Sequence, residues 1–203
     1  MPPSAGASKQ SNPAVKIAVY GPNAREVSAL NVPEIDAVLL GEPDKPAVRF
    51  MRGERGAIGF DRFTRAELYA EDFPFPLFDE DVAHHYADSN PRNAASPHPW
   101  PELTVWGSRG CAFACKVCSC PAALTNDDPT GAGKREIRFH NPTWIHDFVV
   151  DRVRASAKAE RVVKAVRFDG DMENAGPKHT KAICEVMRRV RLPWSMMCRA
   201  DTV

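Results

Sequence analysis

The sequence contains no hydrophobic run that approaches the roughly 20 residues needed to cross a bilayer. Its first residues, MPPSAGASKQSNP, have no apolar segment of the kind found in a secretory signal peptide. The net charge of +1 provides no excess of basic residues for a nucleic-acid-binding surface. We therefore expect a cytoplasmic protein with a disordered leader over residues 1–13, no membrane partner and no nucleic-acid partner.

The middle of the chain has little hydrophobic periodicity and many prolines. The 18 prolines of the sequence gather in stretches such as EDFPFPLF and SNPRNAASPHPWP. Because proline clusters interrupt helices and strands, we expect residues 51–101 to form a linker or crossover between two domains. An apolar share of 43% and a charged share of 26% are ordinary for globular domains on either side of it.

Residues 14–50 alternate between strand-like and helix-like segments. Two apolar runs, VKIAVYG and EIDAVLLGE, each include a strand-terminating glycine, and helical stretches are expected over 25–30 and 45–51. Such alternation is typical of parallel α/β sheets. It predicts a small piece of a parallel α/β sheet over residues 14–50.

The same alternation returns over residues 102–203. LTVWG, RVVKAVRFDGD and PWSMMCRAD are the expected strands, and helices are expected after Asn141 and over GPKHTKAICEVMRRVRL. Strands joined through helices in this way run parallel. Three such strands leave an apolar sheet edge, so we expect a fragment of a larger barrel or a partner chain that completes it.

Four of the six cysteines lie within GSRGCAFACKVCSCP, residues 107–121. A structural zinc site usually takes two separate cysteine pairs, and a redox C-x2-C pair leaves Cys111 unexplained. The spacing of Cys111, Cys115 and Cys118, C-x3-C-x2-C, favours a [4Fe–4S] cluster with one iron left without a protein ligand. Cys120 fits no position of this pattern. Zinc binding and free thiols remain the alternatives.

SRGCAFACKVCSCP, directly after an expected strand, resembles the signature loop of the radical S-adenosylmethionine (SAM) enzymes. REIRFHNPTWIHDFVVDRV is similar to the segment that leads into the first barrel helix of that family. VRFDGDMEN and PWSMMCRADTV resemble its second and third strands. The resemblance implies an α/β fold in which residues 102–203 form the first three strands of a partial (β/α) barrel.

This resemblance also implies the cofactors and the chemistry. The cluster and SAM together would give a 5′-deoxyadenosyl radical, used for methyl transfer or rearrangement of a small-molecule or unknown substrate. An electron donor such as flavodoxin or ferredoxin is an implied partner. Phe113, Val117 and Asp171 are the residues expected to contact the cofactor, with Val117 at a position that is usually aromatic in the family. No catalytic residue is assigned.

The segment VYGPNA…VPEIDAVLLGEPD resembles the second half of the cobalamin-binding domain of B12-dependent radical SAM proteins. The resemblance implies a partial Rossmann-like, cobalamin-binding-type domain over residues 14–50, but the sequence lacks the D-x-H-x-x-G motif that supplies the cobalamin ligand. Cobalamin is therefore a weaker expectation than the cluster and SAM.

A non-catalytic function is the alternative hypothesis. The chain would then be a truncated iron–sulfur or zinc protein that acts as a redox or structural module with a partner. Asp169, Glu173, Arg199 and Asp201 follow expected strands and fit either a ligand site or ordinary turns. TGAGKRE lacks the spacing of a phosphate-binding loop, and we expect a surface turn there.

Overall fold

The computed structural model describes residues 9–21, 24–76, 101–113, 115, 136–159, 162–170 and 172–202. The chain divides into two compact units. The first comprises residues 1–63 and 110–136, and the second comprises residues 64–109 and 137–203. Both contain a three-stranded parallel sheet, so the expected α/β class is confirmed.

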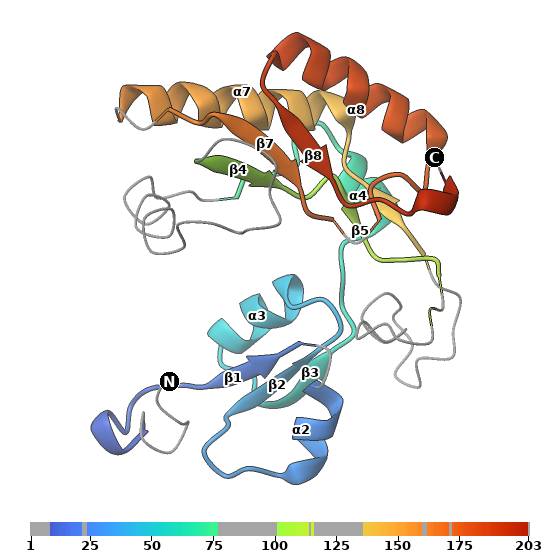
Figure 1. Cartoon of the computed structure of the whole chain (residues 1–203). Coiled ribbons are helices and arrows are strands. Elements are labelled where there is room, and N and C mark those ends of the chain that lie inside the picture. The colour runs from blue at the N-terminus through green and yellow to red at the C-terminus, as the bar shows by residue number, and fades with distance from the viewer. Residues whose placement is uncertain are drawn as a thin grey trace. The chain divides into compact units, whose positions relative to one another are not determined.

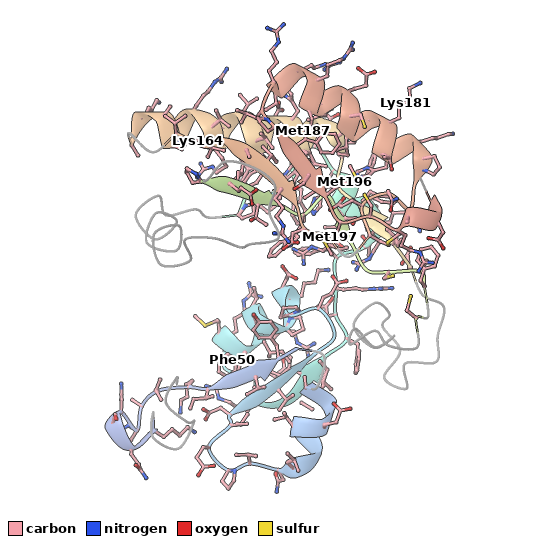
Figure 2. The ribbon with its side chains drawn as sticks, viewed as in Figure 1. Phe50, Lys164, Lys181, Met187, Met196 and Met197 are labelled. Atoms are coloured by element: carbon pink, nitrogen blue, oxygen red, sulfur yellow. The ribbon has the colours of Figure 1, made fainter. Side chains whose placement is uncertain are left out.

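The first unit is built on the parallel sheet β1-β2-β3 (Figure 1). Its elements in chain order are β1 (Ala18–Tyr20), α2 (Ala24–Leu30), β2 (Ala37–Leu40), α3 (Asp44–Met51) and β3 (Gly56–Gly59). Ala37, Leu39 and Ile58 form its small buried cluster, and Phe50 of α3 packs against them (Figure 2). Both runs expected to be strands, and both helices after them, are therefore confirmed.

The expected linker over residues 51–101 contains two further elements. β3 pairs in parallel with β2 and belongs to the first sheet. α4 (Arg65–Tyr69) belongs to the second unit and begins with a capping box between Thr64 and Glu67. The prediction of a plain connector was therefore wrong for both elements. The strand β3 was missed because Gly-Ala-Ile-Gly carries little strand propensity of its own and forms a strand by pairing with β2.

One residue of the expected leader makes a contact within the first unit. Lys9 Nζ lies 3.0 Å from Asp36 Oδ2, and the same carboxylate accepts a hydrogen bond from Ile17 N at 2.8 Å. These two donors lower the pKa of Asp36, with the backbone hydrogen bond as the larger cause. The leader therefore holds an ordered contact at Lys9, while residues 1–8 lie outside the described part.

The second unit is built on the parallel sheet β4-β7-β8 (Figure 1). Its other strands form a two-stranded antiparallel ribbon, β5–β6. The elements after α4 are β4 (Glu102–Val105), β5 (Ser108–Arg109), β6 (Arg138–Phe139), α7 (Pro142–Lys158), β7 (Ala165–Phe168), α8 (Pro177–Val190), β8 (Trp194–Met196) and a 3-10 turn (Ala200–Thr202). The three strands and two helices expected from the sequence are confirmed.

Helices α7 and α8 cover one face of this sheet. Asn141 caps α7 by accepting the Thr143 N–H at 2.8 Å, and Pro142 occupies the first turn. Met187 of α8 is buried, and Met196 of β8 is half-buried against the same cluster (Figure 2). The buried cluster comprises Leu103, Val105, Trp144, Ile145, Phe148, Val149, Val166, Phe168, Ile183, Val186 and Met187.

The opposite face of the sheet is more polar. Thr104, Arg167 and Ser195 are partners in one row of the register across β4, β7 and β8. Since side chains alternate along a strand, they point away from the helix-covered face that holds Val105 and Phe168.

Within the described residues, no helix is long and apolar enough to span a membrane.

Candidate metal centre

The carboxyl ends of β4, β7 and β8 lie at the same edge of the second sheet, because the three strands are parallel. Active sites of parallel α/β barrels form at this edge. The segments that follow the strands are 106–110, 169–176 and 197–202. The cysteine-rich stretch continues from the first of these, so its expected position after a strand is confirmed.

A short antiparallel ribbon forms the base from which the cysteines emerge. β5 pairs with β6 through Ser108↔Phe139 and Arg109↔Arg138, and His140 N donates to Gly107 O at 3.0 Å. Residues 110–137, here called the cysteine segment, therefore leave the ribbon and return to its partner strand. Sequence reasoning missed this ribbon, since its two strands are only two residues long and lie far apart in the chain.

Two of the three predicted cluster ligands lie in the described part of the cysteine segment. The thiol of Cys111 is half-buried, the thiol of Cys115 is exposed, and neither forms a disulfide. Phe113 N lies 3.5 Å from Cys111 Sγ and donates a hydrogen bond to it. Gly110, directly before the first cysteine, has φ of +83°, a conformation that glycine adopts without strain.

The remaining cofactor residues expected from the sequence lie outside the described residues. They are Val117, Cys118 and Asp171, and Cys120, which fits no position of the ligand pattern, also lies outside the described residues. Phe113 lies within the described residues and is half-buried. Its backbone N–H donates the hydrogen bond to Cys111 Sγ. Within the described residues, no group of three or more His, Cys, Asp or Glu side chains could hold a metal ion.

The ribbon places two arginines directly opposite each other. Because cross-strand partners share a face, Arg109 and Arg138 project to the same side of β5–β6. The guanidinium of Arg109 lies 5.8 Å from the centre of the Trp106 ring, and Arg138 is fully buried. Arg109 lies two residues before Cys111 in the sequence.

Two buried histidines flank this ribbon. His140 stacks on Trp144 with ring centres 4.4 Å apart, and His179 of α8 stacks on Phe139 at 4.2 Å. Burial lowers the pKa of His140 to about 3, helped by the charges of Arg109, His179 and Arg138, and lowers that of His179 to about 4. Both rings are therefore neutral near pH 7.

The carboxylates after β7 differ sharply in environment. Asp169 is exposed, and its Oδ1 lies 3.2 Å from Arg167 Nη2. Glu173 is 1% exposed and accepts hydrogen bonds from Gly107 N at 2.9 Å and Gly170 N at 3.0 Å. Burial raises the pKa of Glu173 to about 7, although these two hydrogen bonds oppose the shift.

The residues after β8 form local contacts. Arg199 donates to Asp201 through Nε at 2.8 Å, which lowers the pKa of this exposed aspartate. Cys198 is an exposed thiol whose pKa is raised by partial burial and by the charge of Glu173. Cys184 on α8 is likewise an exposed thiol that forms no disulfide.

Sequence reasoning did not anticipate that Glu173 bridges two strands. The signal that could have indicated it is the pair of glycines, Gly107 and Gly170, that follow β4 and β7.

Comparison of the chain with protein-family models, curated proteins and solved structures finds no match.

Proposed function

We propose that this chain is a radical SAM enzyme that holds a [4Fe–4S] cluster through Cys111, Cys115 and Cys118. The observation that carries the proposal is the C-x3-C-x2-C spacing on a segment that begins at the carboxyl end of the parallel strand β4. Three thiolates leave one iron of such a cluster open, and that iron would bind SAM.

The two described thiols fit cluster ligation chemically. Neither forms a disulfide, the thiol of Cys115 is exposed and that of Cys111 is half-buried, and the Phe113 N–H donates a hydrogen bond to Cys111 Sγ. When bound, the cluster supplies one electron for reductive cleavage of a C–S bond of SAM, which gives a 5′-deoxyadenosyl radical. The residues of this chain hold the cluster and keep the start of the cysteine segment in place.

The fold part of the proposal assigns β4, β7 and β8 to the first three strands of a partial (β/α) barrel. The polar row Thr104, Arg167 and Ser195 would then face the barrel interior. That lining suits a polar small-molecule substrate, for methyl transfer or rearrangement. Asp171, directly after Gly170, stays our proposed contact for the SAM ammonium group.

The first unit is proposed as part of a cobalamin-binding-type domain. Its parallel order β1-β2-β3, with glycines 21 and 41 directly after the first two strands, supports this general class. The sequence has no D-x-H-x-x-G motif, so the residues present do not fit a cobalamin ligated in that way. We assign cobalamin no step in the reaction.

Two protein partners belong to the proposal. A flavodoxin or ferredoxin would deliver the electron to the cluster. A partner chain would add strands beside β8, which within the described residues pairs only with β7. An unpaired strand edge of this kind favours addition of a further strand.

The test is anaerobic reconstitution of the whole chain with iron and sulfide. We expect about four iron and four sulfide per chain, an EPR signal after reduction that changes when SAM is added, and formation of 5′-deoxyadenosine. Cys118→Ala should abolish the cluster, whereas Cys120→Ala, two residues away in the same segment, should leave it intact.

Each other outcome selects a different conclusion. An EPR signal that does not change when SAM is added, with no formation of 5′-deoxyadenosine, would support the alternative of a non-catalytic iron–sulfur module. One tightly bound zinc per chain after purification, with no cluster formed, would support the zinc alternative. Loss of the cluster in Cys120→Ala would overturn the ligand assignment.

A further inference from the structure

Glu173 places one carboxylate oxygen between the ends of two strands. Its Oε1 accepts a hydrogen bond from Gly107 N, just after β4, and another from Gly170 N, just after β7. Both bonds are buried, so each provides a hydrogen-bond acceptor for a backbone N–H that water does not reach. The carboxylate thus joins two loops that lie 66 and 3 residues away in sequence.

The two glycines leave no spare room around this carboxylate. A Cβ atom on Gly107 would lie 2.7 Å from Glu173 Oε2, and a Cβ on Gly170 would overlap Oε1 and lie 2.8 Å from Ser108 O. The Ser108 hydroxyl is close enough to lower the pKa of Glu173, although it makes no hydrogen bond of good geometry. The carboxylate therefore fills a closed cradle made of backbone.

The same cradle is the base of the cysteine segment. Gly107 donates its N–H to Glu173 and accepts the His140 N–H at 3.0 Å, so both its backbone groups are fixed. Ser108 and Arg109 then form the outgoing strand of the β5–β6 ribbon. Cys111 follows only two residues after that strand.

We propose that Glu173 is a positioning residue that fixes the base of the cysteine segment. Its short reach to Gly107 determines where the chain leaves β4 and enters β5, the strand that ends two residues before Cys111. The oxygen that bridges the glycines, Oε1, is committed to the backbone, whereas Oε2 is buried and has no hydrogen-bond partner among the described residues. Its consequence for a cluster rests on the proposed function, but the positioning itself concerns the metal-free chain.

The test measures thiol reactivity in the reduced, metal-free full-length chain. N-ethylmaleimide alkylates each cysteine at a rate that depends on exposure, and peptide mass spectrometry resolves the rates for Cys111, Cys115 and Cys184. Cys184 lies on the solvent side of α8 and serves as the internal reference. Glu173→Asp removes one methylene and cannot reach both glycine amides, whereas Glu173→Gln keeps a carbonyl oxygen in the same position.

We expect Glu173→Asp to raise the alkylation rate of Cys111 relative to Cys184 about fivefold or more. Cys115 is already exposed and further along the segment, so its rate should change less. Glu173→Gln should restore a ratio within about twofold of the wild type, since its carbonyl can still accept both N–H groups.

The proposal is overturned if Glu173→Asp leaves the Cys111 to Cys184 ratio within about twofold of the wild type. It is also overturned if Glu173→Gln and Glu173→Asp raise the ratio equally, because the acceptor geometry would then not matter. A rise in the Cys184 rate itself would indicate general unfolding; amide hydrogen exchange of Gly107 in Glu173→Gln then decides, with protection near the wild-type level expected and loss of protection counting against the proposal.

Reconstitution with iron and sulfide separates this inference from the proposed function. If the wild type takes up a cluster, Glu173→Asp should take up severalfold less under the same conditions. If the wild type takes up none, the proposed function fails while the thiol rates still test the role of Glu173.

Discussion

Asn174 and Arg199 are joined by two hydrogen bonds that copy a rung of a β-sheet. Asn174 Nδ2 donates to Arg199 O at 2.9 Å, and Arg199 N donates to Asn174 Oδ1 at 3.0 Å. One residue earlier, Glu173 N donates to Met197 O at 3.2 Å. The loop after β7 therefore holds the chain that leaves β8 while Glu173 holds the chain that leaves β4.

Replacing Asn174 by Ala should destabilise the second unit by about 2 kcal/mol, since both bonds are lost and Asn174 is buried. Asn174→Asp keeps the acceptor for Arg199 N but turns a buried carboxylate oxygen toward Arg199 O, so it should cost at least as much at neutral pH. Urea unfolding measures both free energies of unfolding. Asn12→Ala is the control, because the Asn12 side chain also accepts a backbone N–H, from Ala14, but in an exposed turn. An Asp variant as stable as the wild type would contradict the two-bond pairing.

Gly170→Ala should destabilise the second unit by about 3 kcal/mol. The added Cβ would meet Glu173 and lie 2.6 Å from Ser108 Oγ, so the carboxylate must move and release the Gly107 amide. The control is Gly53→Ala, where no atom lies within 4 Å of the added carbon but φ is +107°. Backbone strain alone should cost about 1–2 kcal/mol there. Equal losses of unfolding free energy in the two variants would show that the cradle is not closed.

The regular elements could be predicted because their patterns are local. The apolar face of α7 and its Asn141 cap lie within a few residues of each other. A glycine at position 21, 41 or 170 marks the end of a strand in the sequence. β3 could not be predicted in the same way, because Gly-Ala-Ile-Gly becomes a strand only by pairing with β2.

The candidate site shows the same difference between local patterns, which can be predicted, and long-range contacts, which cannot. Cysteine spacing indicates a cluster from sequence alone, since the chemistry depends on residue type and separation. The role of Glu173 depends on burial and on Gly107, which lies 66 positions away, and no local pattern encodes either. From the sequence, Asp171 was the preferred one of the three carboxylates after β7, whereas the structure buries Glu173 and leaves Asp169 at the surface.

Trp144→Phe should destabilise the second unit by about 3 kcal/mol. Trp144 is 3% exposed, and its Nε1 donates to Phe73 O at 2.6 Å, so the smaller ring leaves both a cavity and a carbonyl without its donor. Trp106→Phe is the matched control: Trp106 is 54% exposed, and its loss should cost less than about 0.5 kcal/mol. Urea unfolding measures both variants. A loss below about 1 kcal/mol for Trp144→Phe would show that the Phe73 carbonyl finds another partner.

Buried titratable groups of opposite kinds make stability depend on pH. His140 and His179 have pKa values lowered from 6.5 to about 3 and about 4, so below pH 6.5 the unfolded chain binds protons that the folded chain does not. Their stabilising contribution is complete above pH 6.5 and is lost as the pH falls. Glu173, raised from 4.5 to about 7, does the reverse: its contribution is complete below pH 4.5 and is lost as the pH rises to 7.

Between pH 4.5 and 6.5 the two histidines outweigh the one carboxyl group. The unfolded chain then binds about one proton more than the folded chain, so the free energy of unfolding should fall by about 1.4 kcal/mol for each pH unit of acidification. Urea unfolding at about pH 5 and pH 6.5, followed by tryptophan fluorescence, measures the slope. His140→Phe removes one histidine and should make the slope nearly flat, whereas Glu173→Gln removes the opposing group and should roughly double it. Slopes that change in the same direction in the two variants would mean that at least one of these pKa shifts has the wrong sign.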